Sequence, residues 1–108
     1  MSRRSASAPW TLDETANVPN ICVGADGGTP ASPDSTPTYS VRDAAGLSDG
    51  STLVTGTGVA ISGVTGGYFF SPALTAANGF AAGENYYLVI SYAISTVDYT
   101  DLVDIPVA

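Results

Sequence analysis

The stretch that decides the fold is Tyr86–Ile94 (YYLVISYAI), followed closely by Val97–Val107 (VDYTDLVDIPV). In both runs apolar side chains recur at alternate positions, which is the pattern of a β-strand with one buried face. The faces predicted to be buried carry Tyr86, Leu88, Ile90, Tyr92 and Ile94 in the first run, and Val97, Tyr99, Val103, Ile105 and Val107 in the second. The two runs therefore predict an antiparallel hairpin with both apolar faces on one side.

Acidic residues and a proline interrupt the second run. Asp98, Asp101 and Asp104 recur at every third position, so a strand directs alternate members to opposite faces and they cannot form a compact carboxylate cluster. Pro106 has no N–H to donate to a neighbouring strand. We therefore expect an edge strand, or one whose end leaves the sheet, with charges that discourage further pairing.

Short β-patterned segments precede the hairpin and are separated by glycines. They are Tyr39–Asp43, Leu53–Thr55, Val59–Ile61 and Tyr68–Ser71. This spacing predicts an all-β sandwich or barrel. Gly56–Gly58 predicts a bulge or turn between two of the segments. Ala73–Gly79 predicts one helical turn, ended by a left-handed glycine with Phe80 folding back onto it.

The first 38 residues are rich in Ser, Ala, Pro, Gly and Thr and predict an extended arm plus one short strand around Ile21–Val23. Proline and glycine turns exclude a long helix here. We expect an N-terminal arm over residues 1–19 and a β-sandwich domain over residues 20–108. Trp10 and Leu12 are apolar anchors of the arm, and Trp10 belongs either in the domain's own core or in a partner's pocket.

The composition removes most catalytic chemistry. The 108 residues, 44% of them hydrophobic, suit one folded domain, but they include no His and no Lys. A serine nucleophile therefore lacks its usual base, and Cys22 alone supplies neither a Cys/His zinc site nor an internal disulfide. We expect Cys22 to be a small buried hydrophobe, the protein not to be an enzyme, and no cofactor or catalytic residue.

Two acidic features leave alternatives. A calcium site in a loop is conceivable at Asp26 or Asp49, although the ligand spacing of an EF-hand is absent. Asp34–Thr36 has a faint likeness to the loop of an aspartic protease but lacks the glycine that such a loop needs. We expect Asp34 to be an exposed turn residue.

The formal net charge of −7 argues against nucleic acid and anionic membranes as partners. No apolar run reaches the roughly 18 residues of a membrane-spanning helix. Arg3 and Arg4 stand where a twin-arginine export signal has its pair, but no apolar region follows. We expect a soluble protein or part of an assembly.

Three motifs carry a family resemblance: Tyr39–Gly46 (YSVRDAAG), Ile61–Tyr68 (ISGVTGGY) and Leu74–Tyr87 (LTAANGFAAGENYY). Together with the turn Asp26–Pro30 (DGGTP), they resemble small Ig-like β-sandwich modules of tailed-phage virion proteins. The likeness runs from Gly24 to Ile94. It implies an Ig-like antiparallel β-sandwich of about seven short strands with an extended N-terminal arm.

The resemblance also implies a structural role without catalysis. We expect a capsid decoration or cement protein on the virion exterior, made in the host cytoplasm. Its partners would be the major capsid protein or other virion subunits, with self-association in the assembly. The expected partner interface comprises Arg3, Arg4, Trp10 and Leu12. The alternative is a tail-fibre, neck or cell-surface Ig-like module that recognises a host glycan or protein, with exposed tyrosines such as Tyr87 or Tyr99 stacking on sugars.

Overall fold

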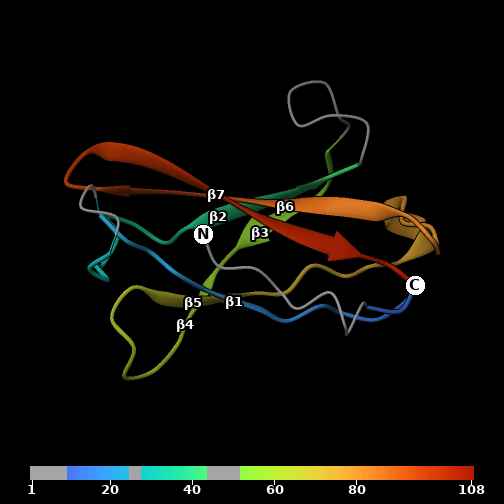
Figure 1. Cartoon of the computed structure of the whole chain (residues 1–108), viewed down its shortest axis with the longest axis horizontal. Coiled ribbons are helices and arrows are strands. Elements are labelled where there is room, and N and C mark those ends of the chain that lie inside the picture. The colour runs from blue at the N-terminus through green and yellow to red at the C-terminus, as the bar shows by residue number, and fades with distance from the viewer. Residues whose placement is uncertain (1–9, 25–27, 44–51) are drawn as a thin grey trace.

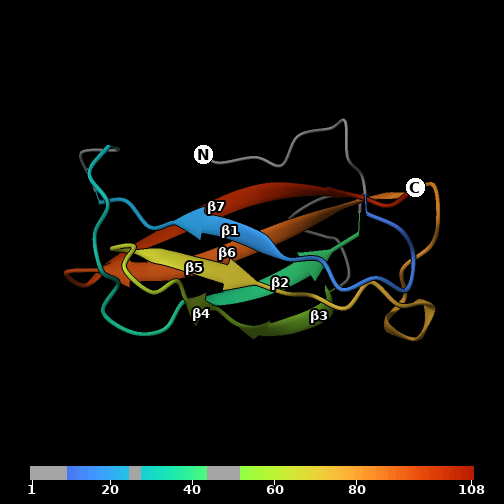
Figure 2. The same ribbon diagram turned by 90° about the horizontal axis from the view of Figure 1, so that it is seen from below.

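The computed structural model describes residues 10–24, 28–43 and 52–108, and in these ranges the chain forms seven strands and one 3₁₀ turn (Figure 1). The strands are β1 (Val18–Ile21), β2 (Thr38–Arg42), β3 (Thr52–Thr57), β4 (Val59–Ala60), β5 (Gly67–Phe70), β6 (Asn85–Ile94) and β7 (Val97–Pro106); the 3₁₀ turn is η1 (Ala76–Asn78). The antiparallel pairs build a three-stranded sheet, β1-β5-β4, and a four-stranded sheet, β3-β2-β6-β7. The sheets pack face to face (Figures 1 and 2).

This strand order confirms the predicted Ig-like sandwich. In the immunoglobulin arrangement, β1, β5 and β4 take the places of strands B, E and D. The other sheet has β7, β6, β2 and β3 in the places of G, F, C and C′. The hydroxyl of Tyr86, near the start of β6, accepts a hydrogen bond from the Ala81 N–H at 2.8 Å, as in the tyrosine corner of such folds.

The β6–β7 hairpin is the longest paired unit, running from Asn85 opposite Pro106 to Ile94 opposite Val97. Its core face is largely as predicted, with Tyr86, Leu88, Ile90, Tyr92, Val103, Ile105 and Val107 buried. Ile94 and Tyr99 are only partly buried against the core, and Val97 is exposed over 51% of its surface. It adjoins the tight turn at Ser95 and Thr96, whose positive φ angles of 51° and 67° suit a two-residue hairpin turn at the sheet's end.

The acidic residues of β7 divide between two faces, as their spacing predicts. β7 lies at the edge of its sheet, and Asp98 and Asp104 share a face opposite to that of Asp101. Asp101 pairs with buried Ile90 and accepts a 2.8 Å hydrogen bond from the side-chain amide of Asn20 in β1. Because Asn20 is only 2% exposed, this bond satisfies a buried polar group and links the edges of the two sheets.

The sandwich begins earlier than the sequence predicts. Trp10 is 4% exposed, and its N–H donates to the Pro106 carbonyl at 3.0 Å. Trp10 also forms a parallel bridge with Val107, while Ala16 and Val18 are buried in the core. Side chains from residues 10–19, the segment predicted as part of the arm, therefore contribute to the core. Of the two positions left open for Trp10, the structure shows the domain's own core.

Two of the predicted glycine positions, Gly79 and Gly58, lie where the chain turns sharply or changes sheet. Gly79 ends η1 with φ 99°, and the Phe80 N–H donates to the Thr75 carbonyl, so the predicted turn and the return of Phe80 are confirmed. Gly58 lies where the chain passes from β3 in one sheet to β4 in the other. Its N–H donates to the Pro37 carbonyl at 2.9 Å. The expected bulge or turn at Gly56–Gly58 is thus a crossing between sheets.

Replacing Gly58 with alanine should destabilise the fold by about 1–3 kcal/mol, because overpacking forces buried groups to move. A Cβ at this position would lie 2.8 Å from the ring of Phe70, which is fully buried. Gly24→Ala is the matched control, since nothing lies within 4 Å of its added Cβ. Urea unfolding would measure the stability of both variants. An unchanged midpoint for Gly58→Ala would contradict the claim that Gly58 is tightly packed against Phe70.

Candidate functional site

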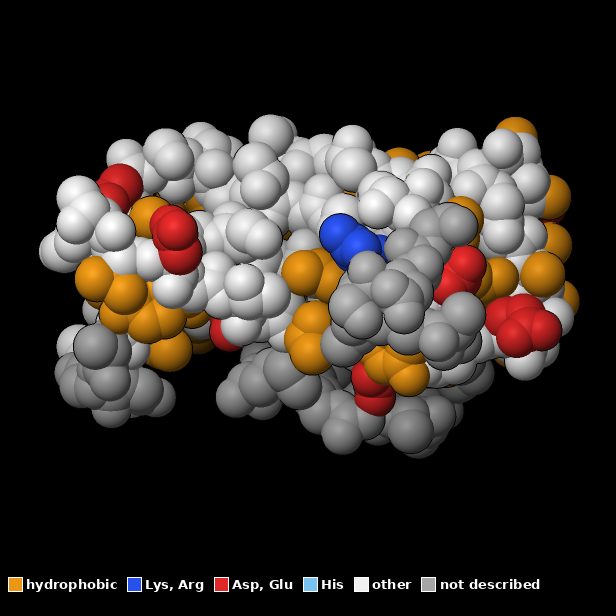
Figure 3. Space-filling view, turned by 90° about the horizontal axis from the view of Figure 1, so that it is seen from above, with side chains coloured by type: hydrophobic (Ala, Val, Ile, Leu, Met, Phe, Trp, Pro, Cys, Tyr) orange, Lys and Arg blue, Asp and Glu red, His pale blue; other side chains and the backbone are white. Residues whose placement is uncertain are grey.

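The outer face of the four-stranded sheet carries a row of hydroxyl groups. Pairing places Thr57 of β3 beside Thr38 of β2, then Ser91 of β6 and Thr100 of β7. All four residues are exposed, and neighbouring strands lie about 4.8 Å apart. Figure 3 looks onto this face, where neutral side chains and backbone, drawn white, share the described surface with orange hydrophobic patches, scattered red acidic groups and a blue basic group. The row offers hydrogen-bond donors and acceptors across the full width of the sheet.

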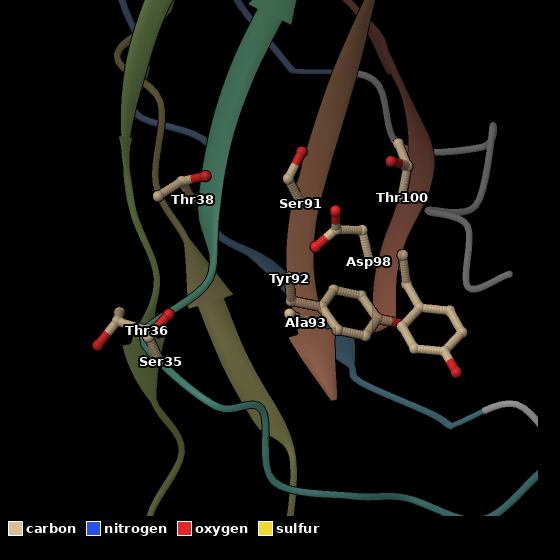
Figure 4. Close-up of a pocket in the computed structure, with 9 residues that line it drawn as sticks. Ser35, Thr36, Thr38, Ser91, Tyr92, Ala93, Asp98 and Thr100 are labelled. Carbon is tan, nitrogen blue, oxygen red and sulfur yellow. The ribbon is translucent and has the colours of Figure 1, made fainter. Parts of the chain in front are cut away.

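One end of this face is hollowed into an open groove of about 460 Å³. Its lining comprises Ser35, Thr36, Thr38, Ser91, Tyr92, Ala93, Asp98, Tyr99 and Thr100. As Figure 4 shows, one wall comes from β2 and the segment before it, and the other from β6 and β7. The rings of Tyr92 and Tyr99 stack with centroids 5.6 Å apart and an angle of 22°. The groove thus combines hydroxyl groups with one exposed carboxylate, that of Asp98.

Asp34 fixes the position of the groove's first wall. Its carboxylate accepts hydrogen bonds from the backbone N–H groups of Ser95 at 2.9 Å and Thr96 at 2.8 Å. Its own N–H donates to the Ala93 carbonyl at 2.7 Å. The expected exposed turn residue is indeed exposed, but it also holds the segment before β2 against the tip of the hairpin. Because the bonded groups lie 61 and 62 residues apart in sequence, no local pattern indicates this role.

The groove offers hydrogen-bonding groups and one charge to a ligand. Hydroxyl groups donate and accept hydrogen bonds, and the carboxylate of Asp98 attracts hydroxyl, amide or cationic donors. Within residues 10–24, 28–43 and 52–108, no three Cys, Asp or Glu side chains gather closely enough to hold a metal ion. Asp26 and Asp49, the calcium alternatives, lie outside the described residues. In the same ranges, no helix has the length and apolar character to cross a membrane.

Cys22 is a core residue, as predicted. Only 1% of its surface is exposed, and burial, together with the nearby negative charge of Asp101, raises the pKa of its thiol to about 11. The thiol therefore stays protonated at neutral pH and is a poor nucleophile. Burial likewise raises the pKa of the neighbouring Tyr92 hydroxyl. This hydroxyl shares long hydrogen bonds with the N–H and carbonyl of Val23, at 3.3 and 3.4 Å.

Of the predicted interface residues, the structure describes Trp10 and Leu12, and neither lines the groove. Arg3 and Arg4 lie outside the described residues. The side chain of Trp10 is buried, and Leu12 is partly buried against the core. The sequence analysis named Tyr99, which lines the groove, but missed the hydroxyl residues Thr38, Ser91 and Thr100, because they align across three strands only when the strand register is known.

Comparison with protein-family models, with curated proteins and with solved structures finds no match to this chain.

Proposed function

We propose that this protein is a non-enzymatic structural subunit of a tailed-phage virion, and that it decorates the outside of the capsid shell. The observation that carries the proposal is the row of exposed hydroxyl groups of Thr57, Thr38, Ser91 and Thr100, which crosses all four strands on the outer face of one sheet. Such a face can form many hydrogen bonds with a neighbouring protein surface. The motif resemblance to phage Ig-like modules supplies the virion context.

The charge distribution supports a position outside the shell. The chain has a formal net charge of −7, and exposed acidic groups include Asp13, Glu14, Glu84 and Asp98. Packaged DNA repels such a surface, whereas solvent and its cations stabilise it. Attachment then falls to the hydroxyl row and to the N-terminal arm, where Arg3 and Arg4 supply positive charge.

Particles lacking this subunit should release their DNA at a lower temperature and at milder salt dilution than complete particles, because decoration cross-links neighbouring shell subunits. Adding the purified chain back should restore the resistance of the particles to heat and to salt dilution. The measurement is DNA release on heating, followed with an intercalating dye. Equal resistance with and without the subunit would contradict a cementing role.

The add-back experiment also separates the arm from the sandwich. The matched variant lacks residues 1–9 and keeps Trp10, whose side chain belongs to the core. We expect this variant to fold but to bind particles weakly, because the two N-terminal arginines are gone. Full binding by the truncated chain would assign attachment to the sandwich alone.

The groove favours a second function, a tail-fibre, neck or cell-surface module that recognises a glycan. Carbohydrate sites use a few placed polar groups to fix a ligand, and a carboxylate readily accepts hydrogen bonds from sugar hydroxyls. Asp98 stands at the groove with Thr38 and Ser91 nearby, and Thr100 lines the same hollow. This arrangement supplies the chemistry for sugar recognition without catalysis.

A glycan array followed by titration of any sugar that binds tests this second function. Asp98→Ala should weaken binding at least tenfold, whereas Glu84→Ala, which removes the same charge from an exposed residue that does not line the groove, should leave it unchanged. No bound glycan, or equal binding by the Asp98→Ala variant, would exclude the groove as a sugar site.

A further inference from the structure

The two sides of the sandwich have edges of opposite character. On one side lie β7 and β1, the edge strands of the two sheets. β7 carries Asp98, Asp101, Asp104 and Pro106, and the backbone at Trp10 bonds to its end. β1 contains Pro19. Charges, prolines and covering segments are the devices by which natural proteins prevent another strand from adding to an edge.

The opposite side lacks these devices over the residues that the structure describes. It consists of β3 and β4, which follow one another along the chain and lie along one side of the molecule (Figure 2). The segment from Thr52 to Ala60 reads TLVTGTGVA and contains neither a charged residue nor proline. Within the described ranges β3 pairs only with β2, and β4 only with β5. Val59, in β4, is 66% exposed. We call this segment the 52–60 edge.

Backbone alternation identifies which groups of the 52–60 edge are open. In an antiparallel ladder, successive residues direct their N–H and C=O groups alternately toward one neighbour and the other. The Gly58 N–H donates to the Pro37 carbonyl, on the β2 side. Gly56, two residues earlier and opposite Tyr39, therefore also bonds toward β2. Thr55 and Thr57 accordingly direct their backbone groups to the open side.

We propose that the 52–60 edge pairs with the same edge of a second copy of this chain, so that two β3 strands run antiparallel across a two-fold axis. Residues opposed across an antiparallel pair must face the same side of the sheet. Pairing Thr55 with Thr55 of the second copy meets this rule and also brings open backbone groups together. The two four-stranded sheets then form one continuous sheet, and the hydroxyl face extends across both copies.

Two copies of the chain repel one another less if they meet at the 52–60 edge than if they meet at the acidic β7 side. Two chains of net charge −7 repel one another, and the β7 side would bring three aspartates per chain into opposition. The 52–60 edge has no charged residue, so strand pairing there brings no charged side chains of that segment into opposition. A self-complementary patch of this kind is what a two-fold dimer requires. The pairing does not depend on where the protein works, since it concerns the purified chain alone.

Sedimentation velocity of the full chain over a range of concentrations tests the proposal, with a species of twice the 10.9 kDa chain mass expected. Thr57→Pro removes an N–H that faces the open side, and Gly56 before it tolerates the restriction that proline imposes. Thr55→Asp places like charges opposite each other at the axis. Each variant should weaken dimerisation at least tenfold, and Thr100→Asp, the matched charge on exposed β7, should not.

Circular dichroism and urea unfolding establish that each variant is folded before its mass is compared. Hydrogen exchange gives an independent readout, because the amides of Thr55 and Thr57 should exchange more slowly in the dimer than in the diluted monomer. A monomer at every concentration would overturn the proposal. So would a dimer that survives both edge substitutions, or one that dissociates equally with Thr100→Asp.

Discussion

The alternating core face of β6 is the constraint on which the rest of the structure depends. β6 pairs with β2 on one side and β7 on the other, and its Leu88 and Ile90 are fully buried. Burying one such side chain contributes about 1.5–3 kcal/mol. The opposite sheet covers this face with Phe70, also fully buried, whose ring meets that of Tyr39 edge to face at 6.0 Å. Once β6 is fixed in this way, its other face, with Ser91, becomes part of the outer surface of the sheet.

That division accounts for the chemistry of the molecule. On the core side, the buried side-chain amide of Asn20 donates a hydrogen bond to the carboxylate of Asp101. The outer side of the same sheet carries Thr38, Ser91 and Thr100. Cys22, whose thiol is the strongest potential nucleophile in the chain, lies in the core with its pKa raised to about 11. What the described residues offer to other molecules is therefore a surface with a groove and an open edge.

The sequence predicts features that depend on neighbouring residues and fails where distant segments meet. The β6–β7 hairpin, the turn ending at Gly79 and the edge position of β7 follow from period-two alternation, glycine and proline. The crossing at Gly58 does not, because a Gly-Thr-Gly run reads equally as a bulge. Likewise the hydroxyl row across four strands and the binding of Asp34 to the hairpin tip depend on a register that no single segment contains.

The central claim is that this protein works as a surface on a larger particle. Cryo-electron microscopy of intact virions, with this chain identified in the map and by mass spectrometry, tests that claim most directly. The account predicts sandwich-shaped density outside the shell, repeated over its surface, with the hydroxyl face of β2, β6 and β7 or the N-terminal arm at the contact. Virions that contain no copy of the chain, or that hold it inside the shell against the DNA, would contradict it.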